Sequence, residues 1–134
     1  MQKRFERKLA SLDAISRWLG NFFAGHHVYK GAEYSINVAV EELFTNMVKY
    51  NMGTSEKILV RIRLEKTRIK LEVIDFDVDR FDPDKAERSS VEGSIEERKV
   101  GGLGLRLVES VVDEISYDYK DRQMKVTVTK NLER

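Results

Sequence analysis

Two neighbouring segments of this chain alternate between apolar and polar residues, and this pattern constrains the fold more than any other feature. Residues 57–65, KILVRIRLE, place Val60, Ile62 and Leu64 on one face and charged side chains on the other. Residues 68–75, RIKLEVID, repeat the alternation. Such a pattern is typical of strands that bury one face. Because only two residues separate the segments, we expect a hairpin whose apolar face is covered by other elements.

Segments with helical periodicity lie on both sides of this hairpin. We predict helices from an N-cap at Ser11 to about residue 24, from 31 to 50, and from 102 to 113. Further strands are predicted at residues 2–9, 114–120 and 124–131. This order predicts an α+β fold, a two-layer sandwich with a mixed, mostly antiparallel sheet and helices on one face. The length of 134 residues, without repeats or a linker, predicts a single domain over residues 1–134.

The composition excludes several kinds of chemistry. The chain has no cysteine, which rules out disulfides, thiol catalysis and cysteine-ligated zinc. Its two histidines, His26 and His27, are adjacent and do not form a multi-histidine metal site by themselves. With 24 basic and 23 acidic residues, the chain carries no strong field for nucleic acid or anionic lipid. No apolar run approaches the ~20 residues that span a membrane, so we expect a cytoplasmic protein with no nucleic-acid or membrane partner.

Glu42 and Asn46 are the first candidate functional pair. They lie four residues apart in a predicted helix, so their side chains are neighbours on one face. A carboxylate can take a proton from an attacking hydroxyl, and an amide oxygen is a suitable ligand for Mg²⁺. The alternative interpretation is that both are ordinary polar residues on a solvated face.

Asp75 is the second candidate. Its place at the end of a predicted strand, on the apolar face, points its carboxylate toward the covering helices. An unpaired charge is costly there. The carboxylate could accept a hydrogen bond from an exocyclic amine such as that of adenine, or it could simply end the strand and begin a turn.

The glycines at 101, 102 and 104 are the third candidate. They open a predicted amphipathic helix, where free N–H groups and the helix dipole favour a phosphate. They could equally form a turn and a close helix–strand contact. The preceding residues, 76–100, show no clear period, and a long stretch of this kind is often a lid or binding loop.

Taken in order, these segments resemble the gyrase, histidine-kinase and MutL-type (GHKL) ATP-binding fold, also called the Bergerat fold. The closest resemblance is to the bacterial anti-sigma-factor serine kinases, and it covers nearly the whole chain. Four stretches carry it: EELFTNMVKYN resembles the N-box, VIDFDVDRFDP the Asp-x-Gly segment with Phe-Asp-Pro, GGLGLRLVESVVDEISY the glycine box and its helix, and KVTVTKNL the final strand.

The resemblance implies a protein-serine kinase that uses ATP and Mg²⁺. Glu42 would be the general base, Asn46 the Mg²⁺ ligand and Asp75 the acceptor for the adenine amine. Backbone N–H groups would wrap the phosphates at Gly101, Gly102, Leu103, Gly104 and Leu105. Lys49, with Arg98 or Lys99 in an ATP lid over about 76–100, would add positive charge.

The resemblance also implies protein partners. An anti-anti-sigma protein of the STAS type would supply the serine, and a sigma factor would be sequestered. Since relatives of this kind commonly pair, we expect a homodimer.

The chain departs from the family pattern after Asp75. The family has glycines two and four residues later, where this chain has Asp77 and Asp79. The approach to Phe81 is one residue longer, which makes Asp77 a second candidate for nucleotide contact. These departures motivate an alternative function, a non-catalytic partner-binding module with a degenerate nucleotide site. A detached histidine-kinase catalytic domain is a third interpretation, disfavoured because no histidine-bearing phosphoacceptor helix is evident.

Overall fold

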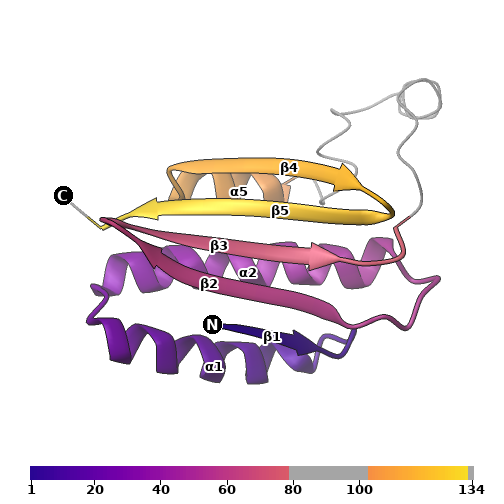
Figure 1. Ribbon diagram of the computed structural model, residues 1–134, viewed down its shortest axis with the longest axis horizontal. Coiled ribbons are helices and arrows are strands. Elements are labelled where there is room, and N and C mark those ends of the chain that lie inside the picture. Colours follow the sequence, from indigo (N-terminus) through magenta and orange to yellow (C-terminus); the bar gives the residue numbers. More distant parts are fainter. Residues whose placement is uncertain (79–102, 133–134) are drawn as a thin grey trace.

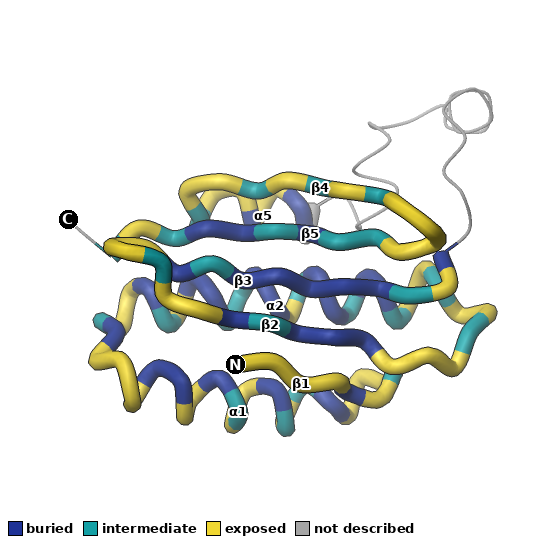
Figure 2. Tube along the Cα trace, viewed as in Figure 1, coloured by how far each residue is buried: buried dark blue, intermediate teal, exposed yellow. Residues whose placement is uncertain are grey.

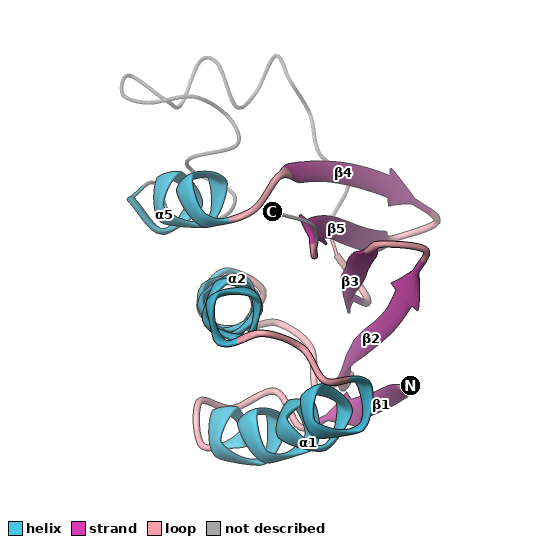
Figure 3. Ribbon diagram, turned by 90° about the vertical axis from the view of Figure 1, so that its left-hand side faces the viewer, coloured by secondary structure: helices cyan, strands magenta, loops and turns pink. Residues whose placement is uncertain are grey.

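An open sheet forms one layer of the molecule and helices cover one of its faces (Figures 1 and 3). The computed structural model describes residues 1–78 and 103–132. Its elements in chain order are β1 (Gln2–Phe5), α1 (Ser11–His26), α2 (Lys30–Tyr50), β2 (Ile58–Glu65), β3 (Arg68–Asp75), α5 (Leu103–Val111), β4 (Glu114–Lys120) and β5 (Gln123–Asn131). The predicted α+β sandwich is confirmed.

The five strands lie in the order β1-β2-β3-β5-β4, and each neighbouring pair is antiparallel. The predicted hairpin is the β2–β3 pair, in which Val60 faces Val73 and Ile62 faces Leu71. β3 is central, and its last residue, Asp75, lies opposite Met124 of β5. The sheet therefore brings the end of β3 next to the β4–β5 hairpin.

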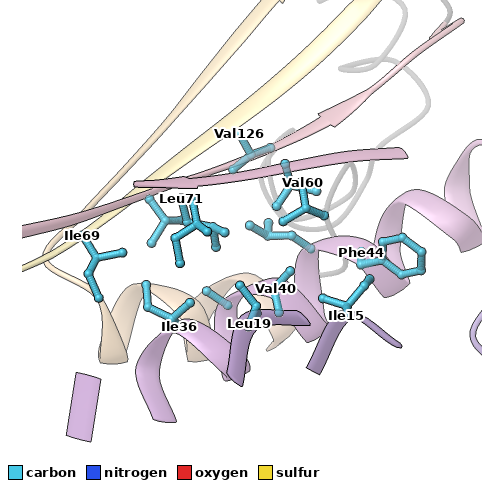
Figure 4. Close-up of a cluster of buried hydrophobic side chains, with 14 of the residues drawn as sticks. Ile15, Leu19, Ile36, Val40, Phe44, Val60, Ile69, Leu71 and Val126 are labelled. Atoms are coloured by element: carbon cyan, nitrogen blue, oxygen red, sulfur yellow. The ribbon is translucent and has the colours of Figure 1, made fainter. Parts of the chain in front are cut away.

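The apolar face of the sheet and the apolar faces of the helices form one core (Figure 4). Figure 2 shows the buried stretches concentrated where these faces meet. Fully buried side chains come from both layers, among them Ile15 and Leu19 of α1, Ile36 and Phe44 of α2, Val60 of β2, and Ile69 and Leu71 of β3. Leu64 is the exception to the predicted face, because it lies near the β2–β3 turn and is 40% exposed.

Several predicted boundaries shift in the structure. The predicted N-cap at Ser11 is wrong, because Ala10 is the cap and Ser11 is the first helical residue. The Ser11 hydroxyl donates instead to the carbonyl of Glu6, at 2.8 Å. α1 also continues to His26, and His27 ends it with a left-handed backbone, φ 52°. The first strand is shorter than predicted, ending at Phe5.

The three helices of the described residues differ in what they cover. In Figure 3, α2 lies over the middle of the sheet, α1 over the β1 side and α5 over the β4–β5 side. None of them combines the length and apolar character needed to cross a lipid bilayer.

Two leucines of the β2–β3 hairpin, Leu71 and Leu64, test this packing. We expect Leu71→Ala to lower the free energy of unfolding by about 2–5 kcal/mol, because it leaves a cavity at a fully buried position. Leu64→Ala, at the 40% exposed position of the neighbouring strand, is the matched control and should lower it by less than about 1 kcal/mol. Urea unfolding followed by circular dichroism measures both, and equal losses would contradict the assigned core.

Candidate functional site

The second half of α2 carries the first predicted pair. Glu42 is half-buried and Asn46, one turn later, is buried with 7% of its surface exposed. The Nδ2 atom of Asn46 has no hydrogen-bond partner among the described residues. A buried polar group left unpaired costs about 1–3 kcal/mol. Asn46 is therefore not part of a solvated face, and its amide is available to a bound group.

Two neighbours of this pair point to solvent. Lys49 and Tyr50 are exposed in the last turn of α2. Tyr50 is 60% exposed, and Met52, just beyond the helix, is 80% exposed. Lys49 is thus exposed at the end of α2 that follows Asn46.

Asp75 lies where the alternation predicted, at the end of β3 and on the helix-covered face, with 4% of its surface exposed. Its carboxylate is paired within the chain. The Nη2 atom of Arg7 donates to Oδ1, and Nδ2 of Asn51 lies 3.3 Å from both carboxylate oxygens. Asn51 also donates to the carbonyl of Phe76, at 3.1 Å. The carboxylate is thus neither free nor a simple turn residue.

Sequence reasoning did not assign a role to Asn51, and it missed Arg7 altogether. Its Nη1 donates to the carbonyl of Met47 at 3.2 Å, and its Nε donates to the carbonyl of Glu56 at 3.0 Å. Arg7 therefore ties the connection between β1 and α1 to the last turn of α2 and to the approach to β2. Because Met47 follows Asn46 in the helix, these bonds bring the end of β3 close to the Glu42–Asn46 half of α2.

The protonation of Asp75 reflects two opposing effects. Burial raises the pKa of Asp75 above its ordinary value, and the hydrogen bonds from Arg7 and Asn51 act in the opposite direction. Burial thus disfavours the negative charge of Asp75, and the hydrogen bonds from Arg7 and Asn51 favour it. Losing either partner would leave a carboxylate that is costly to keep ionised.

Asp77 adopts a backbone conformation that usually favours glycine. Its φ is 57°, in the left-handed region that Asp and Asn enter more readily than other side chains. The Nη2 atom of Arg122 lies 2.6 Å from its Oδ1. Hydrogen bonds from Arg122 and then Thr54 lower the pKa of Asp77. Asp77 thus has a backbone conformation that glycine adopts readily, and its carboxylate is paired to the β4–β5 turn.

Val78, the residue after Asp77, is hydrogen-bonded to the β4–β5 hairpin. The backbone N–H of Val78 donates to the carbonyl of Arg122 at 2.9 Å. The hydroxyl of Tyr119 donates to the carbonyl of Val78 at 2.8 Å. The described start of the predicted lid, residues 76–78, is therefore anchored to the β4–β5 hairpin.

The glycine segment is only partly within the described residues. Leu103 and Gly104 form the start of α5, whose Leu105 and Val108 are buried. The described part of the predicted helix ends at Val111, two residues before the predicted end, and lies beside α2 (Figure 3). Gly101, Gly102 and Asp79 lie outside the described residues, as do Arg98, Lys99 and the rest of the predicted lid.

The donor set limits how a metal could be held. In residues 1–78 and 103–132, no cluster of three or more acidic or histidine side chains could hold a metal ion. Mg²⁺ is commonly bound by one or two protein groups together with phosphate oxygens and water. The Oδ1 atom of Asn46 could serve as such a ligand, whereas the unpaired Nδ2 does not coordinate a metal and would instead donate to a phosphate oxygen. An all-protein cage is not seen in this part of the chain.

Comparison with solved structures shows the fold. The chain is similar to the RsbU and RsbW domains of a Mycobacterium tuberculosis protein, with TM-score 0.73 and 18% identity, covering 100% of this chain and 32% of that one. It is also similar to a chain of the SiaB–SiaC complex from Pseudomonas aeruginosa, with TM-score 0.70 and 14% identity, covering 96% of this chain and 88% of that one.

Sequence comparison identifies the family. No curated protein matches the chain. The model of the histidine kinase-like ATPase domain, however, matches residues 5–130, a span that includes Arg7, Glu42, Asn46 and Asp75. The chain therefore belongs to the histidine kinase-like ATPase domain family.

Proposed function

We propose that this chain binds Mg-ATP and acts as a protein-serine kinase of the anti-sigma-factor type. The observation that carries the proposal is Asn46, whose buried amide lacks a partner one turn after a half-buried carboxylate, Glu42. Native proteins seldom leave such a group unpaired without a functional reason. The family to which the chain belongs is one of ATPase domains, which supports a nucleotide as the missing partner.

In this proposal each candidate residue has one role. Asn46 holds Mg²⁺, which when bound neutralises charge on the phosphate oxygens. Asp75 accepts the adenine amine, with Asp77 beside it at the same end of β3. Backbone N–H groups of the glycine segment hold the phosphates, from Gly101, Gly102, Leu103, Gly104 and Leu105, and Lys49 adds positive charge.

Glu42 carries the chemical step of the proposal. Its carboxylate takes the proton of the partner's serine hydroxyl as the serine oxygen bonds to the γ-phosphorus, and the bond from that phosphorus to the ADP oxygen breaks. Phosphoryl transfer depends mainly on positioning and charge neutralisation, so it needs no covalent nucleophile from the chain.

The proposed partners are proteins. One of the similar structures is a complex of two proteins, SiaB and SiaC, which supports a protein partner for this chain as well. We propose an anti-anti-sigma protein of the STAS type as the source of the serine and a sigma factor as the sequestered partner. We further propose that the chain acts as a homodimer in the cytoplasm.

A second function is favoured by the end of β3. There the carboxylate of Asp75 is paired with Arg7 and Asn51, and that of Asp77 is paired with Arg122. Both groups are satisfied without a ligand. The alternative is therefore a non-catalytic module that regulates partners by binding alone.

Calorimetric titration with Mg-ATP and Mg-ADP separates the two functions. We expect saturable heat with both nucleotides, and a rise in melting temperature because a ligand that binds only the folded state stabilises it. The matched control is ATP with excess chelator, which should bind more weakly if Asn46 acts through Mg²⁺. No heat and no thermal shift at millimolar nucleotide would exclude the kinase and favour the binding module.

Glu42→Gln tests the proposed base. The change keeps the size of the side chain and removes its ability to take a proton, so we expect transfer to the partner serine to fall by about 10²–10⁴-fold while nucleotide stays bound. Glu41→Gln, at the exposed neighbouring position, is the control and should transfer at the wild-type rate. Transfer at the wild-type rate in Glu42→Gln would show that another group takes the proton.

Asn46→Leu tests whether the unpaired amide is kept for binding. Removing a buried, unpaired polar group should leave the free energy of unfolding unchanged or raise it by about 1 kcal/mol, while abolishing the Mg²⁺-dependent part of nucleotide binding. Asn51→Leu is the contrasting control, because its amide is bonded to Asp75 and its loss should lower that free energy by about 1–3 kcal/mol. Equal destabilisation in both variants, measured by urea unfolding, would count against a special role for Asn46.

A further inference from the structure

The carboxylate proposed to bind adenine is already occupied by the chain's own guanidinium. The side chains of Arg7 and Asp75 are 6% and 5% exposed, and Nη2 of Arg7 donates to Oδ1 of Asp75. Asn51 approaches both oxygens. An incoming amine would therefore find little open surface on the carboxylate and a donor already in place.

The existing donor is stronger than the one that would replace it. A guanidinium carries a full positive charge, so its bond to a carboxylate adds the attraction of opposite charges to the hydrogen bond. The exocyclic amine of adenine is neutral and offers only the hydrogen bond. The amine can bond to Oδ1 of this 5% exposed carboxylate only if Arg7 gives way, and the gain from the new bond is then offset by the loss of the old one.

Arg7 lies beside an edge of the sheet, where a local opening would free Asp75. Among the described residues its only acidic partner is Asp75, and its other two bonds go to backbone carbonyls, those of Met47 and Glu56. It follows β1, a four-residue edge strand paired only with β2 and exposed at Gln2, Lys3 and Arg4. Short edge elements of this kind open at lower free energy than the core.

We infer that Arg7 competes with the nucleotide base for Asp75, so that Arg7 sets how strongly this chain selects adenine. The inference rests on the proposed function, since it assumes that nucleotide binds at the end of β3. It adds that the exocyclic amine contributes little to the affinity of the wild-type chain, and that loosening β1 increases that contribution.

The experiment compares ATP with purine riboside triphosphate, which lacks only the exocyclic amine. For the wild-type chain we expect the two dissociation constants, measured by calorimetry with Mg²⁺, to agree within about threefold. In Arg7→Met the charge and the donors are gone and Asp75 becomes available. The dissociation constant of ATP should then be at least about tenfold lower than that of the analogue, because a hydrogen bond to a charged group contributes that much.

Two further variants keep this test sharp. Arg7→Lys retains the charge but cannot bond Met47, Glu56 and Asp75 together, so the preference for ATP should rise by at least about threefold. Arg61→Met is the matched control, because it too removes a guanidinium from a buried carboxylate, that of Glu72, but on the other face of the sheet. For Arg61→Met, the ratio of the dissociation constants of the analogue and ATP should equal that of the wild type. Thermal melting shows which variants are folded. If Arg7→Met is not folded, Arg7→Lys alone tests the inference.

The outcomes separate the inference from the proposed function. If the wild type already prefers ATP by tenfold or more, or if neither folded Arg7 variant raises the preference, Arg7 does not compete with the base and the inference fails alone. If the wild type and the variants bind neither triphosphate at millimolar concentration, the proposed function fails, and the inference fails with it.

Discussion

The ion pair between Arg7 and Asp75 holds together the end of the molecule on which the candidate site depends. It is buried where the β1–α1 connection, the last turn of α2, the approach to β2 and the end of β3 meet. Bringing two charges out of water is expensive, and the pair is maintained only because backbone carbonyls and the amide of Asn51 satisfy the remaining donors and acceptors. Removing either charge from such a pair typically costs about 3–5 kcal/mol. The position of Asp75 relative to α2 therefore follows from Arg7 as much as from the strand that carries it.

The candidate site combines one fully satisfied polar group with one that is not. Asp75 has its partners within the chain, whereas the amide of Asn46 is buried without one among the described residues. An unpaired buried group in a native protein calls for an explanation, such as a bound water or a ligand. The two parts of the candidate site therefore differ in their hydrogen bonding: both carboxylate oxygens of Asp75 have partners within the chain, and Nδ2 of Asn46 has none among the described residues.

The main helices and strands could be predicted from the sequence because the spacing of apolar residues shows which face of each element is buried. The alternation in residues 57–75 fixed β2, β3 and the inward face of Asp75, and helical spacing placed Glu42 and Asn46 on α2. The predicted cap at Ser11 failed because the helix begins one residue earlier than expected, with Ala10 as the cap, and the Ser11 hydroxyl donates to the carbonyl of Glu6 five residues earlier. Such local competition depends on how the chain bends before the helix, which no pattern of residue types records.

Arg7 could not have been predicted, for a different physical reason. It lies between Glu6 and Lys8, in a stretch that reads as solvated, and 68 residues separate it from its partner Asp75. Only the pairing of β1 with β2 brings that stretch to the end of β3, and strand pairing between distant segments is not encoded in any local period. The burial of Asn46 was hidden similarly, because spacing shows which residues share a helix face but not whether that face meets solvent.

Asp77 has a backbone conformation that a glycine could also adopt. Its φ is 57°, in the left-handed region, and Arg122 pairs with its side chain. Arg122 itself belongs to a turn in which Asp121 and Arg122 both have positive φ, so its guanidinium is carried by a tight hairpin. The backbone at Val78 is bonded to the same turn. At the end of β3 two charged pairs, Arg7 with Asp75 and Arg122 with Asp77, therefore surround a backbone path that a glycine at position 77 could also follow.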